Sequence, residues 1–235
     1  MWRCSRLRPS PARHLHSPFQ QSKRTIRMSD KGPKILSSEE MDVSEAKWIT
    51  LKKLNWMDAE GTKRAWECAE RRTRKGSGID AVAILTLLRS KKNAFPLSTV
   101  VIEQYRPPID KFIIELPAGL IDENETAEQA ALRELHEETG YKGDHVTLSS
   151  PVIVADPGMT NANMKLCVVS VNVEDDTVPE PKLDPGEFIV KRVVELSKLM
   201  DELNEYDKKG FVVDAKLYHF ASGLVMAQKI QDGLL

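Results

Sequence analysis

The chain has 235 residues, of which 41% are hydrophobic and 29% are charged, and its formal net charge is −1. These values fit one globular domain with a sizeable core and small additions. No apolar stretch approaches the roughly 20 residues of a membrane span, and the near-neutral charge argues against a nucleic-acid-binding surface built on bulk basicity. We therefore expect neither a membrane nor a nucleic acid as a partner.

Residues 1–28 contain seven basic residues and no acidic residue. This leader, which contains Ser, Arg and Pro, resembles a mitochondrial presequence more than a secretory signal, because a secretory signal requires an apolar central region. We expect residues 1–43 to form a basic leader and linker outside the fold, and we predict a mitochondrial location. The alternatives are a disordered basic tail without a targeting role, or initiation at Met28, which would give a cytoplasmic or nuclear protein.

Residues 44–78 predict a small antiparallel β unit. The stretches 47–55 and 62–73 flank a polar segment that ends at Gly61, whose permissive backbone suits a hairpin turn. A two-stranded hairpin is only marginally stable by itself in water. We therefore expect this unit to pack on the main domain or on a second subunit, which is one physical reason to expect a homodimer.

Residues 79–235 predict a mixed β-sheet between helices, so the expected fold class is α/β (α+β). Strands are expected over residues 80–88, 99–104, 112–116, 146–154, 164–173 and 187–194, and helices over residues 126–139, 197–206 and 214–230. The loop 174–186 is acidic, contains prolines and is predicted to be mobile. The last helix is expected to be amphipathic through Leu217, Phe220, Ala221, Leu224, Val225 and Ile230.

The helix expected at residues 126–139 has a preceding Thr126 and Gln129 that predict a capping box, and a following Gly140 that suits the left-handed position after the last turn. The strand expected before it ends at residue 116, and Pro117 begins a loop that brings backbone carbonyls near Ala118 toward this helix.

Three carboxylates lie at helical spacing on this element. Glu134 and Glu138 are one turn apart on the same face, and Glu137 lies beside them. Like charges at this spacing destabilise a helix by roughly 0.2 to 0.5 kcal/mol per pair, so a cation is expected between them. Arg133 is placed to steady Glu137, which leaves oxygens of Glu134 and Glu138 for a hard cation such as Mg²⁺. The alternative is a solvated acidic helix face.

The acidic helix and the residues around it match the Nudix box, in which a glycine, a glutamate and an Arg-Glu-aliphatic-any-Glu-Glu-any-Gly run stand at fixed offsets. Further stretches at residues 47–48, 64–67, 104–108 and 156–158 resemble the eukaryotic ADP-ribose or ADP-sugar pyrophosphatases of that superfamily. The resemblance covers roughly residues 47–220. The positions of the box are Gly119, Glu125, Arg133, Glu134, Glu137, Glu138, Gly140 and Tyr141.

The resemblance implies an α/β/α sandwich, Mg²⁺-dependent hydrolysis of a diphosphate, with Mn²⁺ as an alternative metal, and a homodimer that exchanges its N-terminal hairpins. On this basis we expect Glu187 to act as the proton acceptor, with Glu137 as the alternative. The expected metal site consists of Glu134, Glu138 and a backbone carbonyl near Ala118, with Glu137 and Glu115 assisting.

The base of the substrate is expected to stack between Trp48 and Trp66, because an aromatic face selects a planar base without fixing which one. Glu67 is placed to accept a hydrogen bond from an exocyclic amine. The resemblance gives these three residues the same roles and takes the two tryptophans from different subunits. The alternative is that both are core residues of the hairpin.

Phosphate or ribose oxygens are expected to bind Arg71 and Arg106, because a planar guanidinium grips two acceptors together. Asp80 contacts the ribose on the family's pattern, or it caps its strand. The expected reaction is hydrolysis of ADP-ribose or a related ADP-sugar to AMP and ribose 5-phosphate. The alternatives are another substrate, such as NADH, a dinucleoside polyphosphate or another nucleoside diphosphate sugar, and a sensor that binds ADP-ribose without turnover.

Overall fold

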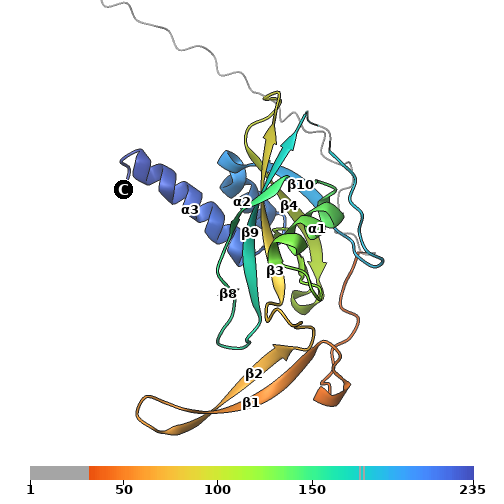
Figure 1. Cartoon of the computed structure of the whole chain (residues 1–235), viewed down its shortest axis with the longest axis vertical. Helices are drawn as coiled ribbons and strands as arrows, with labels where there is room; N and C mark the ends of the chain where they lie inside the picture. Colours follow the sequence, from red (N-terminus) through yellow and green to blue (C-terminus); the bar gives the residue numbers. More distant parts are fainter. Residues whose placement is uncertain (1–31, 175, 177) are drawn as a thin grey trace, which may run out of the picture.

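The structure is a computed structural model that describes residues 32–235 except residues 175 and 177 (Figure 1). Residues 1–31 of the predicted leader and linker (1–43) lie outside the described residues. No helix in the described part combines the length and the apolar character that crossing a membrane requires.

The N-terminal unit is a separate two-stranded antiparallel sheet, as the sequence predicts. A short 3-10 helix, η1 (Val43–Glu45), leads into β1 (Ile49–Met57), which pairs along its whole length with β2 (Lys63–Arg71). In the turn between them, the Asp58 carboxylate accepts hydrogen bonds from the backbone N–H groups of Glu60 and Thr62, and Gly61 has a φ of 81°. Figure 1 shows this hairpin beyond one end of the main sheet.

The main sheet has nine strands and is mixed. Its central order is β11-β5-β4-β3-β9-β7, while β10 pairs with β4, β6 with β3 and β8 with β9. The pairs β3–β9 and β11–β5 are parallel and the others are antiparallel. The strands are β3 (Ala81–Ser90), β4 (Ser98–Arg106), β5 (Lys111–Glu115), β6 (Ala118–Leu120), β7 (His145–Ser149), β8 (Ile153–Val154), β9 (Asn163–Val173), β10 (Val190–Glu195) and β11 (Val212–Val213).

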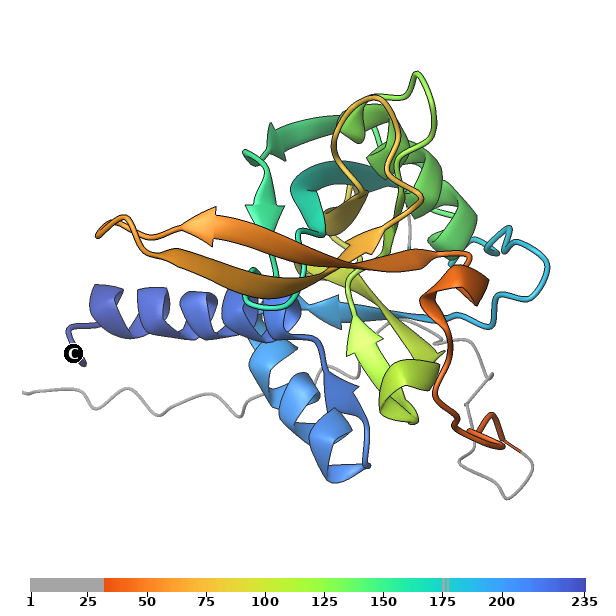
Figure 2. The same cartoon turned by 90° about the horizontal axis from the view of Figure 1, so that it is seen from below.

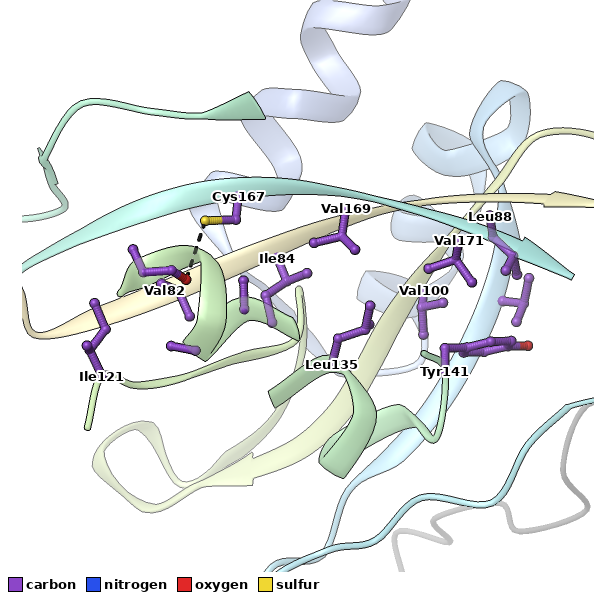
Figure 3. Packing of buried hydrophobic residues seen from close by; sticks show 14 of the residues in the cluster. Val82, Ile84, Leu88, Val100, Ile121, Leu135, Tyr141, Cys167, Val169 and Val171 are labelled. Carbon is purple, nitrogen blue, oxygen red and sulfur yellow. Dashed lines mark hydrogen bonds between the residues drawn. The ribbon is translucent and has the colours of Figure 1, made fainter. Parts of the chain in front are cut away.

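Helices cover both faces of this sheet. α1 (Ala127–Thr139) lies on one side, and α2 (Leu199–Lys208) and α3 (Ala215–Gln231) lie on the other (Figures 1 and 2). Side chains alternate along β3, so Val82 and Ile84 join the core beneath α1 whereas Leu85 joins the core beneath α2 and α3. Figure 3 shows the first of these cores, in which Leu135 of α1 packs toward the sheet. The predicted α/β/α sandwich is confirmed.

Several boundaries differ from those expected. The strand predicted over 146–154 is divided into β7 and β8, and Pro151, which has no N–H to donate, lies in the break. β10 begins at Val190 instead of residue 187, because Gly186 turns the chain with a φ of 95°. The short strands β6 and β11 were not expected, since two or three residues carry no readable periodicity. Where the structure describes the loop predicted to be mobile, the Lys182 N–H donates a hydrogen bond to the Glu137 carbonyl at 2.7 Å.

The amphipathic character expected for α3 is present only in its first half. Of the residues expected to face the core, Leu217 and Ala221 are buried, whereas Ile230 is 64% exposed. The reason is geometric, because the second half of the helix extends beyond the edge of the sheet (Figure 1).

Replacing Gly223 in the middle of α3 with alanine is expected to stabilise the protein by about 0.5 to 1 kcal/mol, since alanine loses less backbone entropy in a helix. A Cβ built at Gly223 has no other atom within 4 Å, apart from the atoms of its own turn. Urea unfolding with Gly233→Ala as the control, where a φ of 66° penalises a side chain, measures the difference. A midpoint lower than that of the wild type would contradict the expectation.

Candidate active site

A cleft of about 630 Å³ lies where α1 meets β3, β5 and β6. Seven carboxylates and four cationic side chains line it. Nine of the residues expected to bind substrate or metal are brought together here, although they come from separate parts of the chain. These nine are Arg71, Arg106, Glu115, Ala118, Arg133, Glu134, Glu137, Glu138 and Glu187.

α1 begins and ends as the sequence predicts, which fixes the direction of its carboxylates. The Thr126 hydroxyl accepts a hydrogen bond from the Gln129 N–H at 3.2 Å, and the Gln129 side chain accepts one from the Thr126 N–H at 2.8 Å. At the other end Gly140 has a φ of 75°, and its N–H donates to the His136 carbonyl. This capping box and left-handed terminus hold the helix that carries Glu134 and Glu138.

Arg133 organises the acidic face of α1 more extensively than expected. Its Nη1 donates to Glu134 Oε1 at 2.8 Å and to Glu137 Oε2 at 3.0 Å. Nε and Nη2 each donate to an oxygen of Glu125 at 2.9 Å, and Nη2 also donates to the Leu120 carbonyl. The sequence predicted that Arg133 would steady one carboxylate, whereas the structure shows three, and Glu125 thereby acquires a positioning role.

Glu138 is the most buried acid in the cleft, at 5% exposure, and its Oε2 accepts a hydrogen bond from the Ala118 N–H at 3.0 Å. The pKa of Glu138 is raised to about 8, mainly by burial; the Ala118 N–H opposes the rise, and the negative charges of Glu134, Glu187 and Glu115 contribute to it. Burial likewise raises the pKa of Glu134 above its ordinary value. The cleft therefore brings several carboxylates together where burial disfavours their negatively charged forms.

Glu115 and Arg106 pair with each other across the adjacent strands β5 and β4. Arg106 Nε lies 2.9 Å and Nη2 2.8 Å from Glu115 Oε1. Burial raises the pKa of Glu115, and the neighbouring Arg106 opposes that rise. Arg71 also lines the cleft, and among the described residues its side chain has no hydrogen bond or ion pair. Arg71 is thus the guanidinium that is free to contact an anion.

A divalent cation fits this group of residues by charge and donor type. No three His, Cys, Asp or Glu side chains within residues 32–174, 176 and 178–235 already converge as a ligand set. The hydrogen bonds explain this, because Arg133 holds Glu134 and Glu137 while the Ala118 N–H holds Glu138. Oxygen donors with an excess of negative charge are nevertheless what Mg²⁺ prefers. Binding would require Arg133 to share these carboxylates with the metal.

The two tryptophans lie on the hairpin and outside the cleft. Trp48 is 70% exposed and Trp66 is 47% exposed, so the alternative that they are core residues of the hairpin is wrong. The Trp66 indole N–H donates to the Gly158 carbonyl at 2.9 Å, which joins the hairpin to the loop before β9. Trp66 and Glu67 line a second, smaller hollow with Lys53 and Ala65.

Asp80 lies at the start of β3 with its side chain 1% exposed. Its two oxygens accept hydrogen bonds from Arg74 Nε and Nη2 at 2.9 and 2.7 Å, and from the Asn163 N–H at 2.9 Å. The Asn163 side chain in turn accepts a hydrogen bond from the Asp80 N–H. These hydrogen bonds favour the alternative that Asp80 caps its strand. They do not favour the predicted contact of Asp80 with the ribose.

Other residues that line the cleft were not singled out in the sequence. Asp184 begins the turn that leads to Glu187, and the Pro-Gly pair between them was the available signal. Lys216 follows Asp214, the N-terminal cap of α3, and forms an ion pair with it at 2.7 Å. Gln104 belongs to the stretch 104–108 that carries the family resemblance, but it was given no role; Asp122 and Met164 gave no signal, because nothing in a single sequence distinguishes them from ordinary loop and strand residues.

Comparison with known proteins identifies the family. The NUDIX domain model matches residues 78–214. A Nudix hydrolase of Schizosaccharomyces pombe is 44% identical over 83% of this chain and 94% of its own. The ADP-ribose pyrophosphatase of Saccharomyces cerevisiae is 39% identical over 87% of this chain and 89% of its own, and the ADP-sugar pyrophosphatase of Mus musculus is 38% identical over 83% and 89%. A crystal structure of an ADP compounds hydrolase covers 89% of this chain and 100% of its own, with a TM-score of 0.52 at 21% identity, which supports the fold. The chain therefore belongs to the Nudix hydrolase family, whose members typically depend on a divalent metal.

Proposed function

We propose that this protein hydrolyses the diphosphate bond of ADP-ribose and related ADP-sugars to AMP and ribose 5-phosphate. The observation that carries the proposal is the cleft itself, in which Glu134, Glu137 and Glu138 of α1 face Arg71 and Arg106. Relatives that are 38 and 39% identical over most of the chain are an ADP-sugar and an ADP-ribose pyrophosphatase, which supports this substrate class.

Mg²⁺ is the proposed cofactor, with Glu134, Glu138 and the backbone near Ala118 as its ligands and Glu115 and Glu137 assisting. When bound there, the metal would neutralise charge on the diphosphate and acidify a water molecule. Arg133 orients the carboxylates, and Arg71 contacts the phosphate oxygens.

Glu187 is the proposed proton acceptor. In the reaction a water oxygen bonds to phosphorus, the bridging P–O bond breaks, and the water proton passes to the Glu187 carboxylate. Glu137 remains the alternative acceptor, although Arg133 Nη1 already lies 3.0 Å from its Oε2 atom.

Stacking of one base between Trp48 and Trp66 would require a homodimer. Trp66 of β2 is opposite Leu54, whereas Trp48 lies just before β1 and its carbonyl accepts a hydrogen bond from the Arg72 N–H, six residues from Trp66, so the backbones of the two tryptophans are about 20 Å apart. A base stacked between two rings requires them within about 14 Å of each other, since each ring centre must lie within about 7 Å of the base. We therefore propose that the base stacks between Trp48 of one subunit and Trp66 of another.

The direct test is hydrolysis by the purified protein with Mg²⁺ of ADP-ribose, ADP-glucose, NADH and a diadenosine polyphosphate, followed by chromatography of the products. AMP and ribose 5-phosphate from ADP-ribose at the highest kcat/KM support the proposal, and EDTA should abolish their release. A higher kcat/KM for NADH or for the diadenosine polyphosphate would assign that compound as the substrate instead. Calorimetric binding of ADP-ribose without products would indicate a sensor.

Replacing Trp48 or Trp66 with alanine is expected to raise KM for ADP-ribose about tenfold or more, because stacking on an aromatic contributes about 1 to 3 kcal/mol per base. Trp56→Ala is the matched control, since Trp56 is 43% exposed and lies nearer the hairpin tip. Light scattering should show dimers for all three variants. Unchanged KM in both Trp48 and Trp66 variants would remove these residues from base recognition.

We also propose that residues 1–43 direct the protein to mitochondria. A fluorescent reporter fused behind residues 1–40 should colocalise with a mitochondrial marker. Diffuse cytosolic fluorescence would reject this location and favour a start at Met28.

A further inference from the structure

The chain between β9 and β10 crosses the C-terminal end of α1 in close contact with it. The Lys182 N–H donates to the Glu137 carbonyl at 2.7 Å. A Cβ added to Gly140 would lie 2.3 Å from the Glu180 carbonyl oxygen and 2.7 Å from its carbon. Backbone atoms cannot give way as a flexible side chain can, so the absence of a side chain at Gly140 allows this crossing.

Lys191 on β10, the strand that follows the crossing segment, contacts the same end of α1. It is 8% exposed, and its ammonium donates to the Thr139 carbonyl, one of the last carbonyls of α1, which lack helical partners. The ammonium also lies 5.4 Å from the centre of the Tyr141 ring. Burial lowers the pKa of Lys191 to about 8, although Glu180 opposes the shift. Burying an ammonium group costs free energy unless the group forms hydrogen bonds. Here it donates a hydrogen bond to a carbonyl at the C-terminal end of a helix, where a positive charge is favourable.

Two residues beyond Lys182, a tight turn presents acids to the cleft. The Glu187 N–H donates to the Asp184 carbonyl at 3.0 Å, and the Asp184 N–H donates to Glu187 Oε2 at 3.2 Å. Pro185 and a Gly186 with a φ of 95° occupy the central positions, as in a type II turn. Asp184 and Glu187 both line the cleft.

The turn is therefore attached on both sides. Lys182 lies five residues before Glu187, and the pairing of Val190 with Glu103 begins three residues after it. Five residues reach at most about 17 Å, so the attachment at α1 limits where Glu187 can go. The same helix end thus carries Glu138 and contacts the segment that leads into the turn.

We propose that Lys191 and Gly140 are positioning residues that hold residues 179–182 on the end of α1 and so place Glu187 at the reacting water. This inference rests on the proposed function, in which Glu187 accepts the proton. Lys191 does not contact substrate, and its effect passes through the backbone of the turn.

The test compares two variants. Lys191→Met keeps a side chain of similar length but removes its hydrogen-bond donor, whereas Lys191→Arg retains a donor. Lys182→Met is the matched control, because only the backbone N–H of Lys182 makes the contact and its side chain is exposed. Lys191→Met should have a kcat about tenfold or more below that of the wild type, with KM changed little. This loss is part of the about 10²- to 10⁴-fold acceleration that a positioned acid or base supplies. Lys191→Arg should recover part of the loss.

Two further measurements separate positioning from a general loss of structure. Amide hydrogen exchange over residues 178–188 should become faster in Lys191→Met and Gly140→Ala and stay unchanged in Lys182→Met. In an enzyme that already carries Glu187→Gln, adding Lys191→Met should lower kcat little further. Unchanged exchange in Lys191→Met, or an equal kcat loss with and without Glu187, would overturn the proposal.

The exchange measurement needs no substrate. It therefore tests the attachment even if ADP-ribose is not hydrolysed, and kcat is then measured on whichever compound of the panel is turned over.

Discussion

Replacing Glu134 or Glu138 with glutamine is expected to lower kcat by about 10²- to 10³-fold or more, a loss typical of removing one electrostatic stabiliser of a transition state. Glutamine keeps the size of the side chain but removes the negative charge that a divalent cation requires. The fold should persist, because burial raises the pKa of both carboxyls and thus already disfavours their charged forms. Glu137→Gln is expected to have a smaller effect, since the Glu137 side chain is 38% exposed.

Steady-state kinetics across a range of Mg²⁺ concentrations, together with thermal unfolding, measure this prediction. Glu128→Gln provides the control on the same helix, because Glu128 is partly exposed, does not line the cleft, and lies 3.7 Å from Lys165. The two cleft variants should require more Mg²⁺ or fail to saturate. Turnover near that of the wild type would show that these carboxylates do not seat the metal.

The sequence was most informative where the structure depends on local spacing. The capping box at Thr126, the left-handed Gly140 and the shared face of Glu134 and Glu138 all follow from interactions within a few residues. The pairing of Arg133 with Glu137 is also local, at four residues apart. Helical geometry alone therefore predicts the core of the candidate site.

Partners far apart in the chain were not predictable in this way. Asp80 meets Asn163 across 83 residues, and this contact depends on the parallel pairing of β3 with β9. Glu115 and Arg106 were assigned separate roles, but Arg106 reaches Glu115 across the β4–β5 pair, although the register places Lys111 opposite Arg106 and Ile102 opposite Glu115. The first contact depends on which strands pair, the second on how far a side chain reaches, and a single sequence contains neither.

The exposed end of α3 shows a second limit of prediction from sequence, which concerns packing. Its apolar residues predicted a helix correctly, but periodicity cannot report how far a sheet extends beneath it. Met226 and Ile230 belong to the second half of α3 and are 47 and 64% exposed. Helix propensity and packing are separate quantities, and only the first can be read from the sequence.

Gly119→Ala is expected to lower kcat about 10²-fold while leaving the free energy of unfolding almost unchanged. A Cβ at Gly119 would lie 1.9 Å from both the Glu134 Cδ and Oε1 atoms. The colliding group is the far end of a flexible side chain, and the φ of Gly119 is outside the left-handed region, so the fold can accept alanine by displacing the carboxylate. A displacement of about 1 Å is enough to cost 10²-fold in rate.

The control for this substitution is Gly76→Ala, where a Cβ has no neighbour within 4 Å and the backbone also tolerates a side chain. Unfolding midpoints of both alanine variants should match the wild type, and only Gly119→Ala should lose turnover. If Gly119→Ala retains its activity, the carboxyl position of Glu134 next to β6 is not required for catalysis. If it unfolds at a much lower denaturant concentration, the collision is relieved through the backbone instead of through Glu134, and the proposed separation of stability from activity at this position is wrong.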